Sequence, residues 1–157
     1  MSDLDKIKKF NRDQIEHVRI VQEQILGFCH TLIFEAFQHD QSKWSDEEYD
    51  AFVASRESLR GSKDGTDEDY QKHLKGEAIQ HHILNNSHHP EYWDKIGETM
   101  PLHEIIAMFF DWRSRSLQRK SSMDDFWKYN IDKLKNQPHA VPIVEAMKRE
   151  YCDDHRK

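Results

Sequence analysis

Features that are rare in the sequence exclude several classes of protein. There are two cysteines, Cys29 and Cys152, which are too few for a disulfide framework and lack zinc-finger spacing, so we expect a reducing compartment. Five glycines and four prolines among 157 residues favour long helices over a turn-rich β fold. No apolar run reaches about 18 residues, and the opening MSDLDKIKKF has no apolar signal-peptide core. We therefore expect a cytoplasmic protein that does not enter a membrane.

Positive charge is also scarce. Lysine and arginine number 23 against 29 aspartates and glutamates, so the formal net charge is −6 at pH 7. Non-specific binding to duplex nucleic acid depends on basic patches that neutralise phosphates, and this balance argues against it. The length indicates one domain over residues 1–157, large enough for its own core. A homodimer is compatible with the sequence, which does not decide the oligomeric state.

The first long stretch of helical spacing covers residues 4–37 and includes the apolar stripe at 18–25, which we assign to the core. Gly27 interrupts this stretch, and glycine commonly lies at helix ends, so two helices are predicted. Folded back as a hairpin at Gly27, they would bring His17, ten residues before the glycine, beside His39, twelve residues after it. One continuous helix would instead separate the two histidines by about 33 Å.

The rest of the chain also has helical periodicity, and no strand-like alternation of any length occurs. Ser45 and Glu48 form a capping-box pattern that starts one of the predicted helices. Helices are predicted over 45–59 and 66–84, from Pro101, after Ser122 and from Pro142, with loops at 61–66 and around Pro90. The predicted fold is an all-α, single-domain helical bundle of five to seven helices.

Histidine is abundant, with 11 residues, and two short motifs contain the most informative ones: HDQSK (39–43) and HHILNNSHHPEYW (81–93). Imidazole nitrogen and carboxylate oxygen bind zinc-like cations at roughly 2.0–2.2 Å. His39 and the adjacent Asp40 are therefore candidate ligands. One member of each later pair, at 81–82 and 88–89, can face inward. We prefer His82 and His88, although the sequence leaves their neighbours open.

Further acidic and basic groups complete the candidate site. Asp111 lies within the apolar segment FFDWR, and an isolated buried carboxylate is costly, so we expect it to face a cation. Lys43 lies one turn beyond His39, where it faces the same site and suits a phosphate oxygen. Arg113 and Arg115, on the same predicted helix as Asp111, are candidates for binding an anionic substrate.

Each of these features has a structural explanation when it is taken alone. A His-Asp pair can be a helix-end hydrogen bond, two His-His pairs can be a polar helix end, and Asp111 can pair with an arginine. The order of the whole set favours a metal site instead. The predicted ligands of one or two divalent ions (Mn, Fe, Co, Zn or Mg) are His17, His39, Asp40, His82, His88 and Asp111.

The ordered set resembles the HD superfamily of metal-dependent phosphohydrolases, whose signature is a first His, an adjacent His-Asp and a final Asp. His17, His39-Asp40 and Asp111 match this signature in order. HDQSK is similar to the HDxxK form of HD-GYP phosphodiesterases and myo-inositol oxygenase. That likeness implies that Lys43 contacts the substrate and that further histidines hold a second metal. HHPEYW resembles a family of short proteins that is common in tailed phages.

The resemblance implies hydrolysis of a small phosphate ester, such as a nucleoside or deoxynucleoside 5′-monophosphate, with metal-bound hydroxide as the nucleophile. Asp40 and Lys43 are the expected catalytic residues, while Asp13 and Glu104 stay open as additional groups. A phage origin would place the protein in the cytoplasm of a bacterial host. Two other functions stay open: a di-iron oxygenase of the myo-inositol-oxygenase type, or a non-catalytic, metal-containing interaction or regulatory protein of phage.

Overall fold

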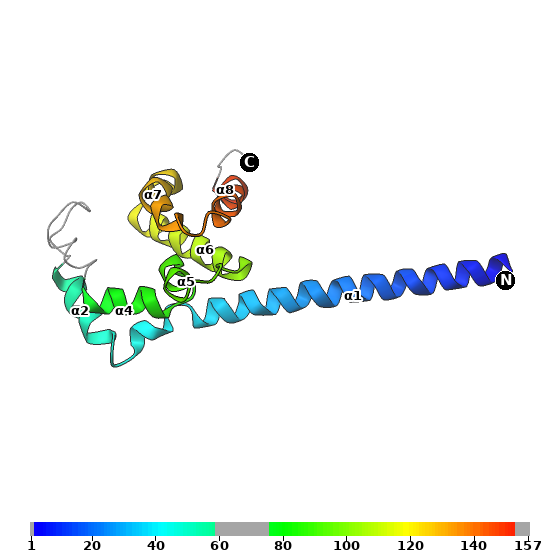
Figure 1. The fold of residues 1–157 in the computed structure, drawn as a ribbon, viewed down its shortest axis with the longest axis horizontal. Helices are drawn as coiled ribbons and strands as arrows, with labels where there is room; N and C mark the ends of the chain where they lie inside the picture. The colour runs from blue at the N-terminus through cyan, green and yellow to red at the C-terminus, as the bar shows by residue number, and fades with distance from the viewer. Residues whose placement is uncertain (1, 59–75, 153–157) are drawn as a thin grey trace. The chain divides into compact units, whose positions relative to one another are not determined.

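The computed structural model describes residues 2–58 and 76–152, and within these ranges it contains seven α-helices and no strand (Figure 1). The predicted all-α helical fold is confirmed. The α-helices are α1 (Asp3–Gln38), α2 (Tyr49–Ser58), α4 (Glu77–Asn85), α5 (Pro90–Ile96), α6 (Leu102–Arg119), α7 (Met123–Asn130) and α8 (Ala140–Tyr151). Two 3₁₀-helices join them, η1 (Gln41–Trp44) and η3 (Ile131–Leu134). The predicted loop at 61–66 and the predicted helix start at Thr66 lie outside the described residues.

The chain divides into two compact units, Met1–Phe37 and Gln38–Lys157. The first unit consists of α1 without its last residue, and no residue of α1 is buried. The prediction that the stripe at 18–25 belongs to the core is therefore wrong. The second unit contains the other described helices, and the helical bundle predicted from the sequence corresponds to this part of the chain.

The predicted hairpin at Gly27 is also wrong, because α1 runs through this position as one uninterrupted helix. A helix that ends at a glycine usually places it in the left-handed region, and Gly27 does not have a positive φ. Glycine inside a helix costs about 1 kcal/mol relative to alanine, which a 36-residue helix tolerates. His17 and Phe37 therefore lie about 30 Å apart along one helix, and the argument that placed His17 beside His39 fails.

We expect Gly27→Ala to stabilise the protein by about 0.5–1 kcal/mol, because alanine loses less backbone entropy in a helix than glycine does. A Cβ at this position would meet no atom within 4 Å, so no steric cost opposes the gain. Far-ultraviolet circular dichroism during urea unfolding measures the effect. Destabilisation by alanine would contradict a continuous α1 and would support the predicted hairpin turn.

The core of the second unit lies between α6, α7 and α8. α6 packs against both other helices, and its apolar residues recur at helical spacing, as the sequence predicts. Trp112 and Trp127 are buried and pack against each other, with ring centroids 6.1 Å apart. The buried apolar residues are Met100, Ile105, Met108, Phe109, Trp112, Met123, Trp127, Leu134, Ala140 and Val144. This core fixes α6, whose residues Asp111 and Arg115 belong to the candidate site.

Several helix ends differ from the prediction by a few residues. Ser122 caps α7 as expected, since its hydroxyl accepts a hydrogen bond from the Asp125 backbone amide at 3.0 Å. Pro90, predicted to lie in a loop, is the first residue of the short helix α5. α8 begins at Ala140, two residues before Pro142. Among the described residues, no helix combines the length and the apolar character needed to cross a membrane.

Candidate metal centre

Separate segments of the second unit bring the candidate ligands together. His39 and Asp40 form the turn that leads into η1, and Lys43 lies on η1 itself. His82 lies near the end of α4, and His88 follows in the loop before α5. Asp111 and Arg115 lie on α6, four residues apart and therefore on one face of the helix.

Asp40 contacts ligands from several of these segments. Its Oδ1 is 3.0 Å from Nε2 of His82 and 3.6 Å from Nε2 of His88. Its Oδ2 is 3.6 Å from Nε2 of His39, and the same nitrogen is 3.5 Å from Oδ1 of Asp111. The backbone of Asp40 has a φ of 59°, in the left-handed region. Such conformations persist where the surroundings enforce them, and they cluster at functional sites.

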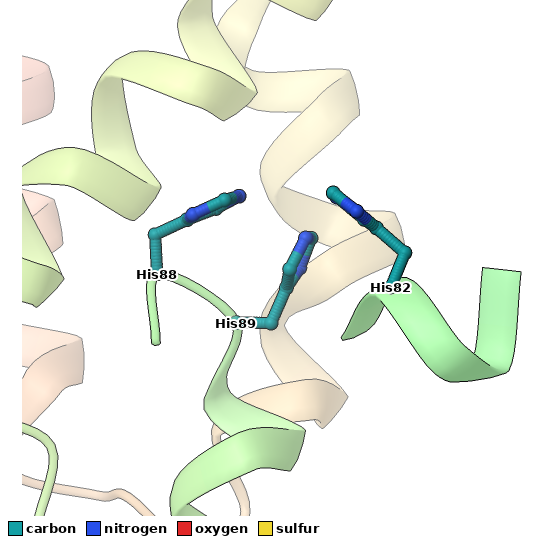
Figure 2. Close-up of side chains that lie close together, drawn as sticks. All are labelled: His82, His88 and His89. Atoms are coloured by element: carbon teal, nitrogen blue, oxygen red, sulfur yellow. The ribbon is translucent and has the colours of Figure 1, made fainter. Parts of the chain in front are cut away.

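The imidazole rings form two groups that share His88. The ligand atoms of His82, His88 and His89 all lie within 4.8 Å of one another, and so do those of His39, Asp40 and His88. Figure 2 shows the rings of the first group turned towards one another, one from α4 and two from the loop that follows. The rings of His88 and His89 have centroids 4.3 Å apart. Both groups fit the donor set of a borderline divalent cation.

Unsatisfied polar atoms support this reading. Oδ1 of Asp40 and the Nε2 atoms of His82, His88 and His89 are buried, and none of them has a hydrogen-bond partner among the residues that the structure describes. A buried polar atom without a partner costs about 1–3 kcal/mol, so four of them close together would be a substantial penalty. One or two cations held by these groups would give each of the four atoms a partner. The residues present therefore fit a divalent metal ion.

The pKa shifts of Asp40, Asp111 and His89 suit a metal, whereas the hydrogen bond to Asp111 raises the pKa of His39 in the metal-free protein. Burial acts to raise the pKa of the Asp40 carboxyl, but its histidine neighbours and Lys43 hold that pKa well below its usual range. Burial likewise opposes ionisation of Asp111, yet the adjacent His39 leaves its pKa lowered. Burial lowers the pKa of His89, which keeps its ring neutral. Ionised carboxylates and neutral imidazoles are the forms that bind metals.

Two cationic side chains lie beside the acidic ligands. Nζ of Lys43 is 2.5 Å from Oδ2 of Asp40. Arg115 approaches the same oxygen at 3.5 Å and Oδ1 of Asp111 at 3.6 Å. Arg113, also predicted to bind the substrate, is engaged elsewhere, because it donates a hydrogen bond to the Tyr151 carbonyl at 3.0 Å. Two residues along a helix point to nearly opposite sides, so Arg113 and Arg115 cannot share one face.

The predicted ligands of the second unit are thus neighbours, whereas His17 belongs to the first unit and the hairpin on which its prediction rested is absent from α1. Of the pair at 81–82, His82 is 3% exposed and its Nε2 faces Asp40, whereas the His81 side chain is 50% exposed. His17 and Asp13 lie on α1 and are exposed. Glu104 is buried on α6 but belongs to neither of the two groups that share His88.

Two residues at the site were not predicted from the sequence. The sequence offers His89 only as an alternative to His88, and the structure places the ligand atoms of both in one group. Glu48 was assigned to a capping box, yet it is fully buried and its carboxylate contacts His82 and His81. A glutamate three residues after a serine is a local signal, and nothing in the sequence connects it with histidines more than 30 positions away.

A family model described as a family of unknown function, DUF5662, matches residues 6–150. The chain belongs to this family. No curated protein and no solved structure matches the chain. The matched range of DUF5662 includes every residue of the candidate site, from His39 to Arg115.

Proposed function

We propose that this DUF5662 protein is a metal-dependent phosphohydrolase that acts on a small phosphate ester, with nucleoside 5′-monophosphates as the first substrate class to test. The observation that carries the proposal is the cluster of four unpartnered, buried ligand atoms beside two cationic side chains. The resemblance of His39-Asp40 and Asp111 to the HD signature supports the same function. The fold and the family membership give no information about the substrate.

The proposed metal ligands are His39, Asp40, His82, His88 and Asp111, with His89 as a further ligand. A divalent ion at this position would supply a Lewis acid for phosphate oxygens and a water of lowered pKa. The ordering of these side chains by the surrounding helices would hold the reacting groups in place without reorganisation.

Lys43 and Arg115 are the proposed phosphate-binding residues. Both cations approach Oδ2 of Asp40, and their side chains are 23% and 33% exposed, so they are partly accessible to a ligand. A phosphate oxygen would offer each of them a second anionic partner, with a fork-shaped contact for the guanidinium. Their positive charge would then neutralise the charge that develops on the transferred phosphoryl group.

The experiment is a screen for release of inorganic phosphate from nucleoside 5′-monophosphates with manganese, cobalt, zinc, iron or magnesium. Lys43→Met should lower kcat/KM by roughly 100-fold, because it removes one charge that stabilises the transition state. Its metal affinity should not fall, because the ammonium group competes with the metal for Oδ2 of Asp40.

Lys9→Met, at an exposed position on α1, is the matched control and should retain full activity. Absence of phosphate release with every ion would reject the proposed function. Full activity in Lys43→Met would show that this lysine does not bind the substrate.

A further inference from the structure

A set of buried hydrogen bonds lies on the far side of the His82 ring from Asp40. Glu48 is 0% exposed, and its Oε2 is 3.0 Å from Nδ1 of His82. Oε1 of the same carboxylate is 2.8 Å from Nδ1 of His81. The Ser42 hydroxyl donates to Oε2 at 3.0 Å. Glu48 thus contacts the ring nitrogen that does not face the proposed metal.

The chemistry of a carboxylate determines which nitrogen of His82 carries the proton. Nδ1 of His82 also lies 3.0 Å from the Ser42 hydroxyl and 3.1 Å from Nδ2 of Asn86. The two amide hydrogens of Asn86 have acceptors in the His82 carbonyl and the Ser42 hydroxyl, so they do not require a lone pair on Nδ1. An ionised carboxylate only accepts hydrogen bonds, so the contact with Glu48 favours a proton on Nδ1. In a neutral ring, Nε2 then has a free lone pair. This is the atom that lies 3.0 Å from Oδ1 of Asp40.

The alternative is a positively charged ring that donates to Glu48 from Nδ1 and to Asp40 from Nε2. The distance of 3.0 Å would allow the second hydrogen bond, but neither Nε2 of His82 nor Oδ1 of Asp40 has a hydrogen-bond partner within residues 2–58 and 76–152. The two atoms are close without the alignment that a hydrogen bond needs. Two lone pairs directed at a common point are the arrangement that a cation satisfies.

We propose that Glu48 is a positioning residue for the metal centre: it fixes His82 in the Nδ1–H tautomer and so directs the Nε2 lone pair at the cation. This inference rests on the proposed metal site and adds a residue that acts through a ligand without contacting the metal. Carboxylates that accept from the outer nitrogen of a metal-binding histidine fix its orientation and raise its basicity.

The tautomer can be measured in the metal-free protein by ¹⁵N nuclear magnetic resonance of the imidazole nitrogens. The signals of His82 are assigned by their loss in His82→Gln. We expect a protonated Nδ1 and an unprotonated Nε2 in the wild type. In Glu48→Gln the amide group can donate to Nδ1, so a substantial population should shift to the Nε2–H tautomer, which cannot bind a metal through Nε2.

Metal affinity provides the second readout. Cobalt or zinc titration against a chromophoric chelator should give a 10–100-fold weaker affinity for Glu48→Gln than for the wild type. Asp94→Asn is the matched control, because Asp94 accepts hydrogen bonds from Asn136 and Gln137 and has no histidine partner. This control should retain both the tautomer and the affinity of the wild type.

A wild-type His82 that is protonated on Nε2 would overturn the inference, even if Glu48→Gln fails to fold. An unchanged tautomer or an unchanged metal affinity in Glu48→Gln would overturn it as well. These results are distinguishable from failure of the proposed function. A wild type that binds metal tightly while Glu48→Gln binds equally well removes only the role of Glu48, and a wild type that binds no divalent ion removes the metal centre itself.

Discussion

Asp40→Asn is expected to abolish metal binding and to lower phosphate release at least about 1,000-fold. Both carboxylate oxygens of Asp40 face other groups of the site: Oδ1 lies near His82 and His88, and Oδ2 lies near His39 and Lys43. A metal contributes several kcal/mol to the transition state, and each 1.36 kcal/mol is a factor of ten in rate. Asparagine removes the negative charge and turns one acceptor into a donor that repels a cation.

The fold should survive this substitution. Asn has the shape of Asp and tolerates the left-handed backbone conformation that position 40 requires. Circular dichroism should therefore show an unchanged helical content, while metal titration and a phosphate assay show the loss. Asp132→Asn, at an exposed position on η3, serves as the control and should behave like the wild type. Phosphate release within tenfold of the wild type in Asp40→Asn would contradict the site.

The helices of the second unit could be predicted because their local signals agree with their packing. In α6 and α7 the apolar period matches the buried face, and Ser122 supplies both the expected cap and the observed hydrogen bond. Errors occur where one residue type has two local uses. The residue before a proline is disfavoured in a helix, but proline itself suits the first position of a helix. Pro90 occupies such a first position, in α5.

Local sequence signals could not decide between the predicted hairpin at Gly27 and the continuous helix α1. Gly27 lowers helix stability by only a fraction of what a 36-residue helix gains from its other positions. Whether a helix continues through a glycine therefore depends on what the flanking residues contact, and the apolar stripe at 18–25 does not identify its partner. The nearly symmetrical spacing of His17 and His39 about Gly27 brings the two histidines together only if the chain turns at this glycine.

Candidate site residues can be predicted from the sequence where the signal is local, as in a short motif or an acid with apolar neighbours. The motif HDQSK identified His39, Asp40 and Lys43, and the apolar surroundings of Asp111 identified the acid on α6. The choice between Arg113 and Arg115 needed the helix phase relative to Asp111. A spacing of four residues places Arg115, and not Arg113, on the helix face of Asp111.

The contacts of Glu48 could not be predicted from its neighbours in the sequence. A capping box would direct its side chain back to Ser45, but α2 begins at Tyr49 and the Glu48 side chain turns inward. The local pattern and the contact with His82 use the same carboxylate, so a single sequence cannot distinguish them. Only the position of α4, which is set by tertiary packing, decides between the two.

Addition of a divalent ion to the metal-free protein is expected to raise Tm by about 8–16 °C. A ligand that binds only the native state contributes about 4 kcal/mol at a free concentration 1,000 times its Kd. In a chain of 150–250 residues each 1 kcal/mol shifts Tm by about 2–4 °C. The physical source of the gain is the set of four buried ligand atoms that have no hydrogen-bond partner in the described part of the folded chain. Differential scanning fluorimetry with manganese, cobalt and zinc, reversed by a chelator, measures the shift.

This stabilisation separates metal binding from catalysis, because it needs no substrate. Lys43→Met should retain the shift in Tm, since Lys43 is not a ligand and its ammonium group competes with the ion for Asp40. His88→Ala should lose most of it, because His88 belongs to both groups of ligand atoms. His30→Ala, which removes an exposed histidine of α1, should retain the full shift and controls for weak surface binding. An equal shift in His88→Ala and His30→Ala would mean that the ion binds outside the proposed centre, and the four unpartnered atoms would then need another explanation.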